Sequence, residues 1–140
     1  MEIKELHSLS DTDWAAIDEL MKQLTNEHTV TRSMIQEVLQ TPGSHLFAMF
    51  DGDAIIGCAT LCVFVSPTGR KADIEDVVVA ESYRGRHLGR ELLEFLIDRA
   101  REQAPIDIHL TSRPARIAAN ALYQSLGFQK RDTNVYKLSL

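Results

Sequence analysis

The chain has 140 residues, of which 44% are hydrophobic and 25% are charged, and its formal net charge is -5. This length and composition predict one globular domain, residues 1–140, with a core of ordinary size. The negative charge argues against a broad nucleic-acid surface, and no apolar run approaches the roughly 20 residues of a membrane-spanning helix. The first residues hold no apolar signal core, so we expect a cytoplasmic protein with neither nucleic-acid nor membrane partners.

The first half of the chain is predicted to contain both strands and helices. Ser10 and Thr31 each precede an amphipathic stretch and are typical helix N-caps. The sequence Asp-Gly-Asp at 51–53 predicts a hairpin turn between two apolar strands. The predicted elements are a strand over 2–7, a helix after Ser10, a helix after Thr31, and strands over 46–50 and 54–65.

The connection between the two predicted helices carries Glu27, His28 and Arg32. These side chains could face a substrate, or they could be solvated charges on a loop. Because charged residues are mostly exposed in proteins, the second interpretation is the more frequent outcome for each residue alone.

The two cysteines, Cys58 and Cys62, lie four residues apart on one face of a predicted strand. A strand separates such positions by roughly 13 Å, which is too far for a disulfide. No other cysteine or histidine nearby completes a zinc site. We therefore predict two small core residues and no metal.

Residues 73–101 are predicted to form a strand, a sharp turn and a helix. The segment 73–79 is rich in valine and isoleucine, and from Leu88 the apolar residues follow the spacing of one helix face. The turn between them contains Gly85 and Gly89. Because the first backbone N–H groups of a helix lack partners, this arrangement is suited to binding an anion.

Cations surround the predicted start of this helix, although helix N-termini favour acidic residues. Each cation there costs an isolated helix roughly 0.3–1 kcal/mol. A multiply charged anion such as a pyrophosphate would relieve this repulsion, and a solvated basic turn is the alternative that charge alone leaves equally open. The cations are Arg84, Arg86, His87 and Arg90.

The last third of the chain is predicted to add strands and one more helix. Pro105 precedes a strand over 106–110, Pro114 suits the start of a helix, and Gly127 suits its end. Strands over 128–130 and 134–140 would close the sheet. The expected fold is α/β (α+β), with a mixed, mostly antiparallel sheet of six to seven strands and about four helices.

Two motifs give the chain a resemblance to the GNAT-type N-acetyltransferases over almost its whole length. The first is the apolar strand followed by Tyr83 and the run Arg-Gly-Arg-His-Leu-Gly at 84–89. The second is Leu-Tyr-Gln-Ser-Leu-Gly-Phe at 122–128. The stretch 74–76 is also similar to glucosamine-phosphate N-acetyltransferases, a weaker likeness that does not indicate their substrate.

The resemblance implies acetyl-CoA as the cosubstrate and a set of residues that hold it. The pyrophosphate would lie on the turn, the pantetheine arm along the strand before it, and Asn120 and Tyr123 beside the arm and the sulfur. His87 stands where the family motif has its first glycine, and Arg116 where many relatives have asparagine. The implied cofactor-binding residues are Val77, Val78, Val79, Arg84, Gly85, Arg86, His87, Leu88, Gly89, Arg90, Asn120 and Tyr123.

Acetylation of an amine needs a base, because a primary amine is mostly protonated at neutral pH. Glu75 is the first candidate and Asp76 the second. Strand alternation places Asp73 and Glu75 on one face and Asp76 on the other, and a bulge, frequent in the family, would change that parity. Backbone N–H groups near Val79 could stabilise the oxyanion. Tyr123 is the candidate donor to the leaving thiolate.

The predicted function is acetyl transfer from acetyl-CoA to a primary amine of a small molecule, by direct attack in a ternary complex. A peptide or protein amine is the alternative acceptor. A non-catalytic acyl-CoA-binding module, suggested by His87 in the turn, is the alternative from another functional class. The oligomeric state is left open, with a homodimer among the arrangements considered.

Overall fold

The computed structural model describes all residues, 1–140, as two compact units, Met1–Leu110 and Thr111–Leu140. The larger unit contains one five-stranded sheet, and the smaller unit contains one helix. No helix is both long and apolar enough to cross a membrane. That the two units act as one acetyltransferase domain stays a prediction.

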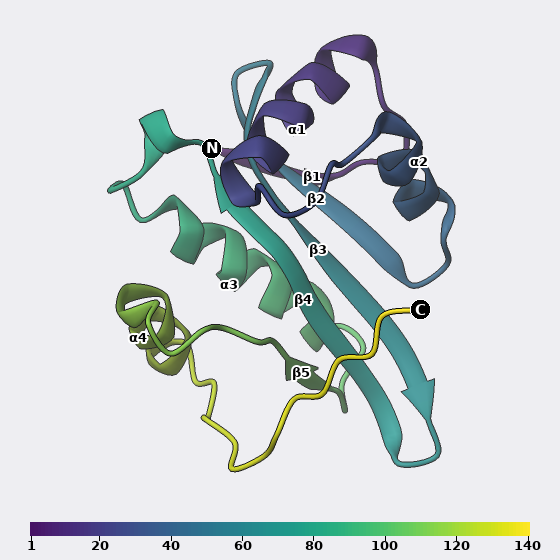
Figure 1. The fold of residues 1–140 in the computed structure, drawn as a ribbon, viewed down its shortest axis with the longest axis vertical. Coiled ribbons are helices and arrows are strands. Elements are labelled where there is room, and N and C mark those ends of the chain that lie inside the picture. The colour runs from purple at the N-terminus through teal and green to yellow at the C-terminus, as the bar shows by residue number, and fades with distance from the viewer. The chain divides into compact units, whose positions relative to one another are not determined.

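The sheet of the larger unit has the strand order β1-β2-β3-β4-β5 (Figure 1). Neighbouring strands are antiparallel except for β4 and β5, which are parallel. This confirms the predicted mixed, mostly antiparallel sheet, although its five strands are fewer than the six to seven expected. The strands are β1 (Glu2–Glu5), β2 (Ser44–Asp51), β3 (Ala54–Ser66), β4 (Gly69–Val79) and β5 (Asp107–His109).

Two of the helices begin at the predicted caps. Helix α1 (Asp11–Leu24) follows Ser10, whose Oγ accepts a hydrogen bond from the Asp13 N–H over 3.0 Å, and α2 (Arg32–Gln40) follows Thr31, whose side chain accepts from Met34. Such a cap is worth about 1 kcal/mol. Both caps satisfy N–H groups that the helix itself leaves without partners.

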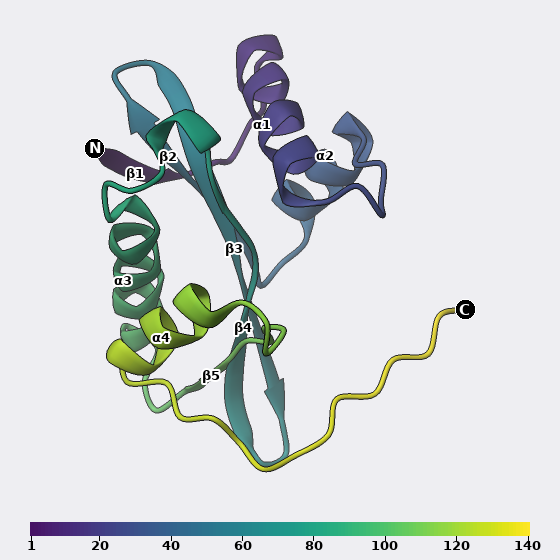
Figure 2. The ribbon, with the colours of Figure 1, turned by 60° about the vertical axis from the view of Figure 1, so that its left-hand side comes forward.

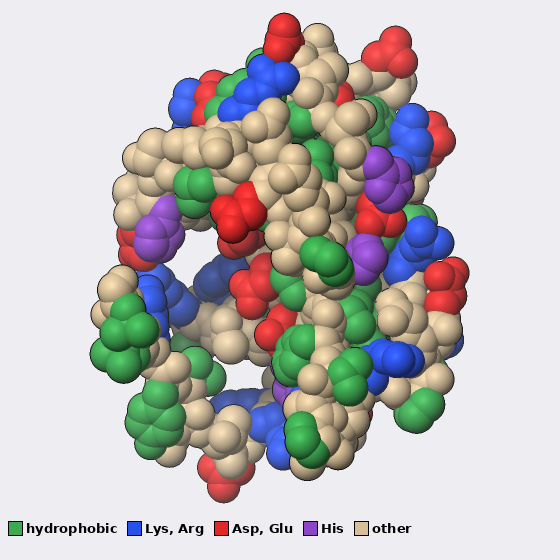
Figure 3. All heavy atoms as spheres, turned by 90° about the vertical axis from the view of Figure 1, so that its right-hand side faces the viewer, with side chains coloured by type: hydrophobic (Ala, Val, Ile, Leu, Met, Phe, Trp, Pro, Cys, Tyr) green, Lys and Arg blue, Asp and Glu red, His purple; other side chains and the backbone are tan.

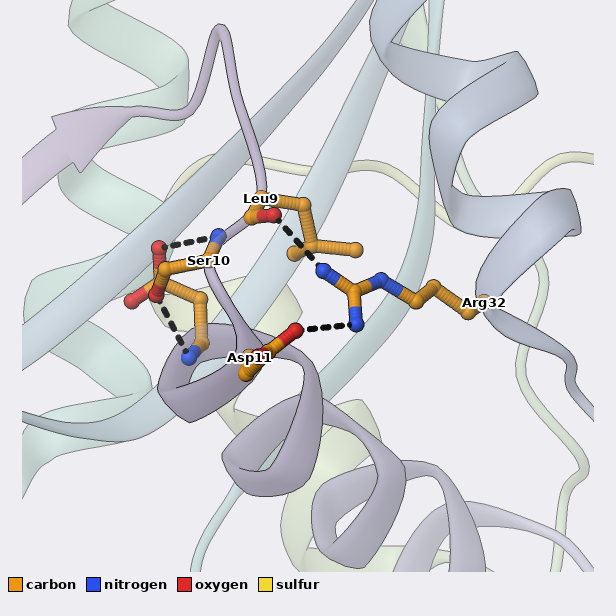
Figure 4. A network of polar contacts seen from close by, with 5 residues as sticks. Leu9, Ser10, Asp11 and Arg32 are labelled. Carbon is orange, nitrogen blue, oxygen red and sulfur yellow. Dashed lines mark hydrogen bonds and ion pairs between the residues drawn. The ribbon is translucent and has the colours of Figure 1, made fainter.

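Arg32 ties the two helix starts together (Figure 4). Its guanidinium pairs with the Asp11 carboxylate over 2.6 Å and donates to the Leu9 carbonyl over 3.0 Å. These contacts give Arg32 a structural role. They therefore do not support the interpretation that its side chain faces a substrate. Glu27 and His28 lie exposed on the connection.

The sheet separates two layers of helix (Figures 1 and 2). On one face, Ile17, Leu20 and Ile35 from α1 and α2 pack with Leu46 and Cys58 of the sheet. On the other face lies α3 (Leu88–Arg101), which buries the apolar stripe predicted from its spacing. The residues of that stripe buried in the structure are Leu88, Leu92, Leu93, Leu96 and Ala100, and burial of each leucine contributes roughly 2 kcal/mol.

Strand β4 contains a bulge. Thr60 pairs with Glu75 and Cys58 with Val78, so two residues of β4 oppose the single Ala59 of β3. Asp76, the first of the two, has φ of +53°, a left-handed conformation that aspartate tolerates better than most residues. The bulge reverses the alternation of side chains along the rest of β4.

The smaller unit contains α4 (Ile117–Ser125), which ends before Gly127 as predicted. The helix begins three residues after Pro114, because the residues between form a turn that the Asn120 side chain holds. The strands predicted over 128–130 and 134–140 are wrong. Beyond Phe128 the backbone makes no ladder, since a strand exists only where a neighbouring strand supplies hydrogen bonds.

Candidate acetyl-CoA and amine site

The turn between β4 and α3 has an unusual backbone. After the short 3-10 helix η1 (Glu81–Tyr83), Gly85 has φ of +80° and His87 has φ of +59°. Arg84, which precedes them, and Arg86, which lies between them, have negative φ. Alternation of left-handed and ordinary residues turns successive N–H groups toward one side, which makes a concave anion-binding surface.

Because Leu88 begins the buried stripe of α3, His87 just before it would be expected in the ordinary helical conformation. The structure shows that it is not. It is the N-cap of α3, in the left-handed region, and its side chain makes no capping hydrogen bond. The physical reason lies in the turn, since the chain must reverse between β4 and α3 within a few residues. A left-handed cap is also where glycine is favoured, which explains the glycine of the family motif at this position.

The start of α3 lacks the internal partners that α1 and α2 have. No side chain caps it, and the backbone N–H groups of Gly85, Arg86 and His87 donate no hydrogen bond. A β-carbon placed on Gly85 or on Gly89 would meet no atom within 4 Å. Unpaired donors beside open space at a helix N-terminus fit a phosphate group.

Cations add charge to this surface. Arg84 and Arg86 are exposed and have no carboxylate partner; Arg84 donates to the Val79 carbonyl over 3.3 Å, and the Arg86 guanidinium lies 4.9 Å from the Tyr83 ring centre. Arg90 instead pairs with Glu94 over 2.9 Å. The charge that Arg84 and Arg86 carry is thus available to an anion.

Two contacts from distant segments hold the turn in place. The Tyr83 hydroxyl donates to the Asp51 carboxylate over 2.7 Å, and the Glu81 N–H donates to the Gln23 side chain over 2.8 Å. Sequence analysis assigned Asp51 only to a hairpin turn and gave Gln23 no role. No local signal could have found these contacts, because they join β2 and α1 to η1 across the fold.

The β5-facing edge of β4 is open near the turn. Strand β5 pairs with β4 only at Lys71, Ala72 and Asp73, whereas β4 continues to Val79. The backbone groups on this edge between residues 74 and 79 therefore have no strand neighbour on that side. An extended amide-containing chain could hydrogen-bond there, as another strand would.

Three carboxylates gather at the bulge. Glu75 pairs with Thr60, and Thr60 pairs with Leu46 of the core that α1 and α2 cover, so Glu75 lies on that face of the sheet. Figure 3 shows a group of carboxylate side chains (red) near the middle of the face it draws. Burial raises the pKa of the Glu75 carboxyl above its ordinary value, and the charges of Asp76 and Asp73 raise it further.

The same charges reach the cysteines. Burial raises the pKa of the Cys58 thiol to about 12, with a smaller contribution from Asp76. The pKa of the Cys62 thiol is also raised, first by burial and then by all three carboxylates. The charge of Asp76 thus raises the pKa of Glu75 and of both cysteines. This agrees with a bulge that breaks the strict alternation of side chains along β4. Both cysteines are free thiols, Cys58 buried and Cys62 half-buried.

In the smaller unit, Asn120 and Tyr123 lie on α4. The Asn120 amide donates to the carbonyls of Arg113 and Arg116 over 2.9 and 2.8 Å, so it fixes the turn before the helix. Tyr123 is half-buried, with its ring edge-on to Phe128 at 6.2 Å. No hydrogen bond of the Tyr123 hydroxyl is present, so the hydroxyl is available to a ligand.

A comparison of the sequence with models of known protein families shows which family the chain belongs to. The family model described as "Acetyltransferase (GNAT) family" matches residues 6–128. The chain belongs to this family. The resemblance seen in the turn and in the Leu-Tyr-Gly-Phe motif is confirmed, and the assignment to acyltransferase enzymes is confirmed at the level of the family.

Individual relatives are more distant. The chain is 29% identical over 105 residues to N-acetyltransferase 8B of Rattus norvegicus, covering 74% of this chain and 47% of the relative. It is 32% identical over 92 residues to N-alpha-acetyltransferase RimI of Mycobacterium tuberculosis, covering 66% and 56%. The chain thus spans about half the length of the curated relatives it matches.

Among solved structures, glucosamine-6-phosphate N-acetyltransferase from Arabidopsis thaliana superimposes with a TM-score of 0.80. The match covers 98% of this chain and 97% of that one, at 22% sequence identity. At this identity the likeness shows a common fold and nothing about the substrate.

Proposed function

We propose that this chain transfers an acetyl group from acetyl-CoA to a primary amine of a small molecule, by direct attack in a ternary complex. One observation carries the proposal. Strand β4 leads from a group of carboxylates on one face, past an open backbone edge, to an uncapped helix start with unpaired N–H groups and cations.

For the donor, the proposal assigns the pyrophosphate to the N–H groups of residues 84–89 and the pantetheine arm to the open edge at Val77, Val78 and Val79. The fit is supported by the open space at Gly85 and Gly89 and by the guanidinium groups of Arg84 and Arg86, neither of which pairs with a carboxylate. Acetyl-CoA supplies a thioester whose carbonyl carbon accepts the amine. Binding should weaken with salt, because the contact is partly ionic.

For the acceptor, the proposal assigns the proton from the ammonium to Glu75, directly or through water, with Asp76 as the second candidate. The free amine then forms the bond to the carbonyl carbon as the carbon–sulfur bond breaks. A raised pKa suits Glu75 for this task, since a base works best when its pKa approaches the working pH. The negative group also attracts the cationic acceptor before proton transfer.

For the departing thiolate, the proposal assigns a proton or hydrogen bond from the Tyr123 hydroxyl. Backbone N–H groups near Val79 would stabilise the oxyanion that forms on the carbonyl. Asn120 would contact the cofactor arm through its carbonyl oxygen, since its amide N–H groups already bond the turn before α4.

A peptide α-amine is the second candidate acceptor. It is favoured because one relative is named an N-alpha-acetyltransferase. An ammonium group on either acceptor would meet the same carboxylates.

Acetyl-dependent thiol release, measured with a panel of small amines and short peptides, tests the proposal. Release that depends on a small amine supports the first candidate, and release with peptides alone supports the second. CoA binding by calorimetry without release for any acceptor would leave a binding module. No CoA binding at millimolar concentration would overturn the proposal altogether.

A further inference from the structure

Tyr83, the last residue of η1, contacts two charged groups with different parts of its side chain. Its hydroxyl donates to the Asp51 carboxylate over 2.7 Å, and the Arg86 guanidinium lies 4.9 Å from the centre of its ring. Asp51 and Arg86 form no ion pair with each other. The tyrosine therefore joins a carboxylate and a guanidinium that do not pair directly.

Asp51 belongs to a tight hairpin of the sheet. It is the last residue of β2 and pairs with Ala54 at the start of β3, so only Gly52 and Asp53 lie between the two strands. A two-residue loop between antiparallel strands adopts few backbone conformations. The carboxylate that accepts the Tyr83 hydrogen bond is thus carried by a well-defined part of the sheet.

The ionisation of Tyr83 responds to both neighbours. The hydrogen bond to Asp51 is the largest cause that raises the pKa of the Tyr83 hydroxyl above its ordinary value, and the charge of Arg86 acts in the opposite direction. Because the net shift is upward, the hydroxyl keeps its proton at neutral pH and goes on donating it to Asp51. A hydrogen bond to an ionised carboxylate is stronger than one between neutral groups.

Arg86 lies inside the anion-binding surface of the turn. It stands between the left-handed residues Gly85 and His87, and its exposed side chain has no carboxylate partner. A long side chain that becomes ordered only when a ligand binds costs binding free energy. A guanidinium already stacked on an aromatic ring is restricted beforehand, and at an exposed site such a contact is worth roughly two- to fivefold in a binding constant.

We propose that Asp51 is a positioning residue for the donor: through Tyr83 it holds the Arg86 guanidinium beside the turn, where that guanidinium pairs with a phosphate of CoA. The inference rests on the proposed function, which assigns the pyrophosphate to residues 84–89. Asp51 needs no contact with the ligand for this role. It fixes the tyrosine hydroxyl, the ring orients the guanidinium, and the guanidinium meets the phosphate.

Arg84 provides an internal comparison. Its Nε donates to the Val79 carbonyl over 3.3 Å, and no aromatic ring lies against its guanidinium. The orientation of Arg84 therefore depends on β4 and not on the hairpin. A change at Asp51 should alter what Arg86 contributes to CoA affinity and leave the contribution of Arg84 intact.

The sign of the Asp51 effect separates positioning from simple electrostatics. A carboxylate near the turn repels an anionic ligand, so loss of its charge alone should tighten CoA binding. Loss of a positioning contact should weaken binding instead. In titration calorimetry we expect Asp51→Ala to bind CoA about fivefold more weakly, the upper end of the range for a cation over an exposed ring.

Two further variants control for charge and for the hydrogen bond. Asp53→Ala removes the same charge from the same hairpin at a residue that does not bond Tyr83, and it should leave CoA affinity unchanged or slightly tighter. Asp51→Asn keeps a side-chain oxygen that can accept from Tyr83, so it should retain the affinity within about twofold. Urea denaturation checks that each variant stays folded.

A double-mutant cycle shows whether the effect passes through Arg86. In an Arg86→Gln background, Asp51→Ala should change CoA affinity by less than about twofold, whereas in the matched Arg84→Gln background it should keep its effect of about fivefold. Tyr83→Phe keeps the ring and loses the hydroxyl, so it should match Asp51→Ala and add nothing to it.

The outcomes distinguish this inference from the proposed function. Tighter CoA binding by Asp51→Ala, or an equal loss in the Arg84→Gln and Arg86→Gln backgrounds, would overturn the positioning role while leaving CoA binding at the turn intact. An equal loss would mean that Asp51 holds the backbone of the turn and not the guanidinium. A wild-type chain that binds no CoA would overturn the proposed function and this inference with it.

Discussion

The basic turn at 84–90 and the acidic stretch at 73–76 lie on the same strand–turn–helix segment, yet they are built in different ways. The turn is made of backbone: left-handed Gly85 and His87, unpaired N–H groups and an uncapped helix. The acidic stretch is made of side chains that a bulge brings together. A backbone site depends on local sequence, whereas a side-chain site depends on the register of strands far apart in the chain.

The largest expected effect concerns the side-chain site. Glu75→Gln should lower kcat/KM about 100-fold near neutral pH, because general bases typically contribute 10²–10⁴-fold. The loss should shrink as pH rises and free amine accumulates. Asp73→Asn, on the same row with the same change of charge, is the control and should keep most activity. A pH-independent loss, or none, would move the base to Asp76 or to a chain of waters.

The raised pKa of Glu75 gives a pH dependence with a defined sign. The base acts only when ionised, so kcat/KM should fall on the acid side with a midpoint above that of an ordinary glutamate, and Glu75→Gln should remove this limb. Because the folded-state pKa is raised, Glu75 costs stability once ionised, and stability should fall as pH rises through that pKa. Chemical denaturation at several pH values should find the Gln variant more stable above it. A more stable wild type there would contradict the assigned shift.

The next effect concerns the backbone site. Arg84→Glu should weaken CoA binding tens of fold, because it places a negative charge beside the unpaired N–H groups and one guanidinium is lost. Titration calorimetry measures the change. Arg101→Glu, the same substitution at the other end of α3, is the matched control and should leave the affinity within about twofold. Equal effects would show that net charge, and not the turn, governs binding.

A smaller effect is expected at Tyr123. Tyr123→Phe should lower kcat about tenfold while leaving the acetyl-CoA dissociation constant nearly unchanged, because the hydroxyl matters mainly as the thiolate forms. Steady-state kinetics and calorimetry on the same preparation separate the two quantities. An unchanged kcat with chemistry rate-limiting would assign the side chain to packing against Phe128.

The sequence predicted the elements whose signals are local. Ser10 and Thr31 cap helices, the leucines after Leu88 form the buried stripe, and Gly127 follows α4. The signal for each of these lies within one or two turns of chain, so no tertiary information was needed.

The sequence could not predict features that depend on neighbours. The left-handed state of His87 follows from the reversal between β4 and α3, and the grouping of Asp76 with Glu75 follows from a bulge opposite Ala59. The alternation at 134–140 predicted a strand, and this is wrong because a strand also needs a neighbouring strand to pair with. The structure has no strand in that segment.

The smallest effect tests the backbone of the turn. A left-handed residue other than glycine costs roughly 1–2 kcal/mol. Glycine would remove this strain, but its greater conformational freedom in the unfolded state would offset part of the gain in stability. His87→Gly should therefore stabilise the fold by up to about 1 kcal/mol and change CoA affinity less than threefold. Urea denaturation and calorimetry provide the two measurements. A loss of stability would instead indicate an ordinary helical residue at this position.

The central claim is that the turn at 84–89 holds the pyrophosphate of the donor, and a comparison of CoA with pantetheine tests it most directly. Pantetheine keeps the arm but lacks the phosphates. Calorimetry at low and at high salt should show CoA binding at least about 100-fold more tightly, roughly 2.7 kcal/mol, with the ratio falling as salt rises. Equal affinities for the two ligands, or a ratio indifferent to salt, would contradict the account.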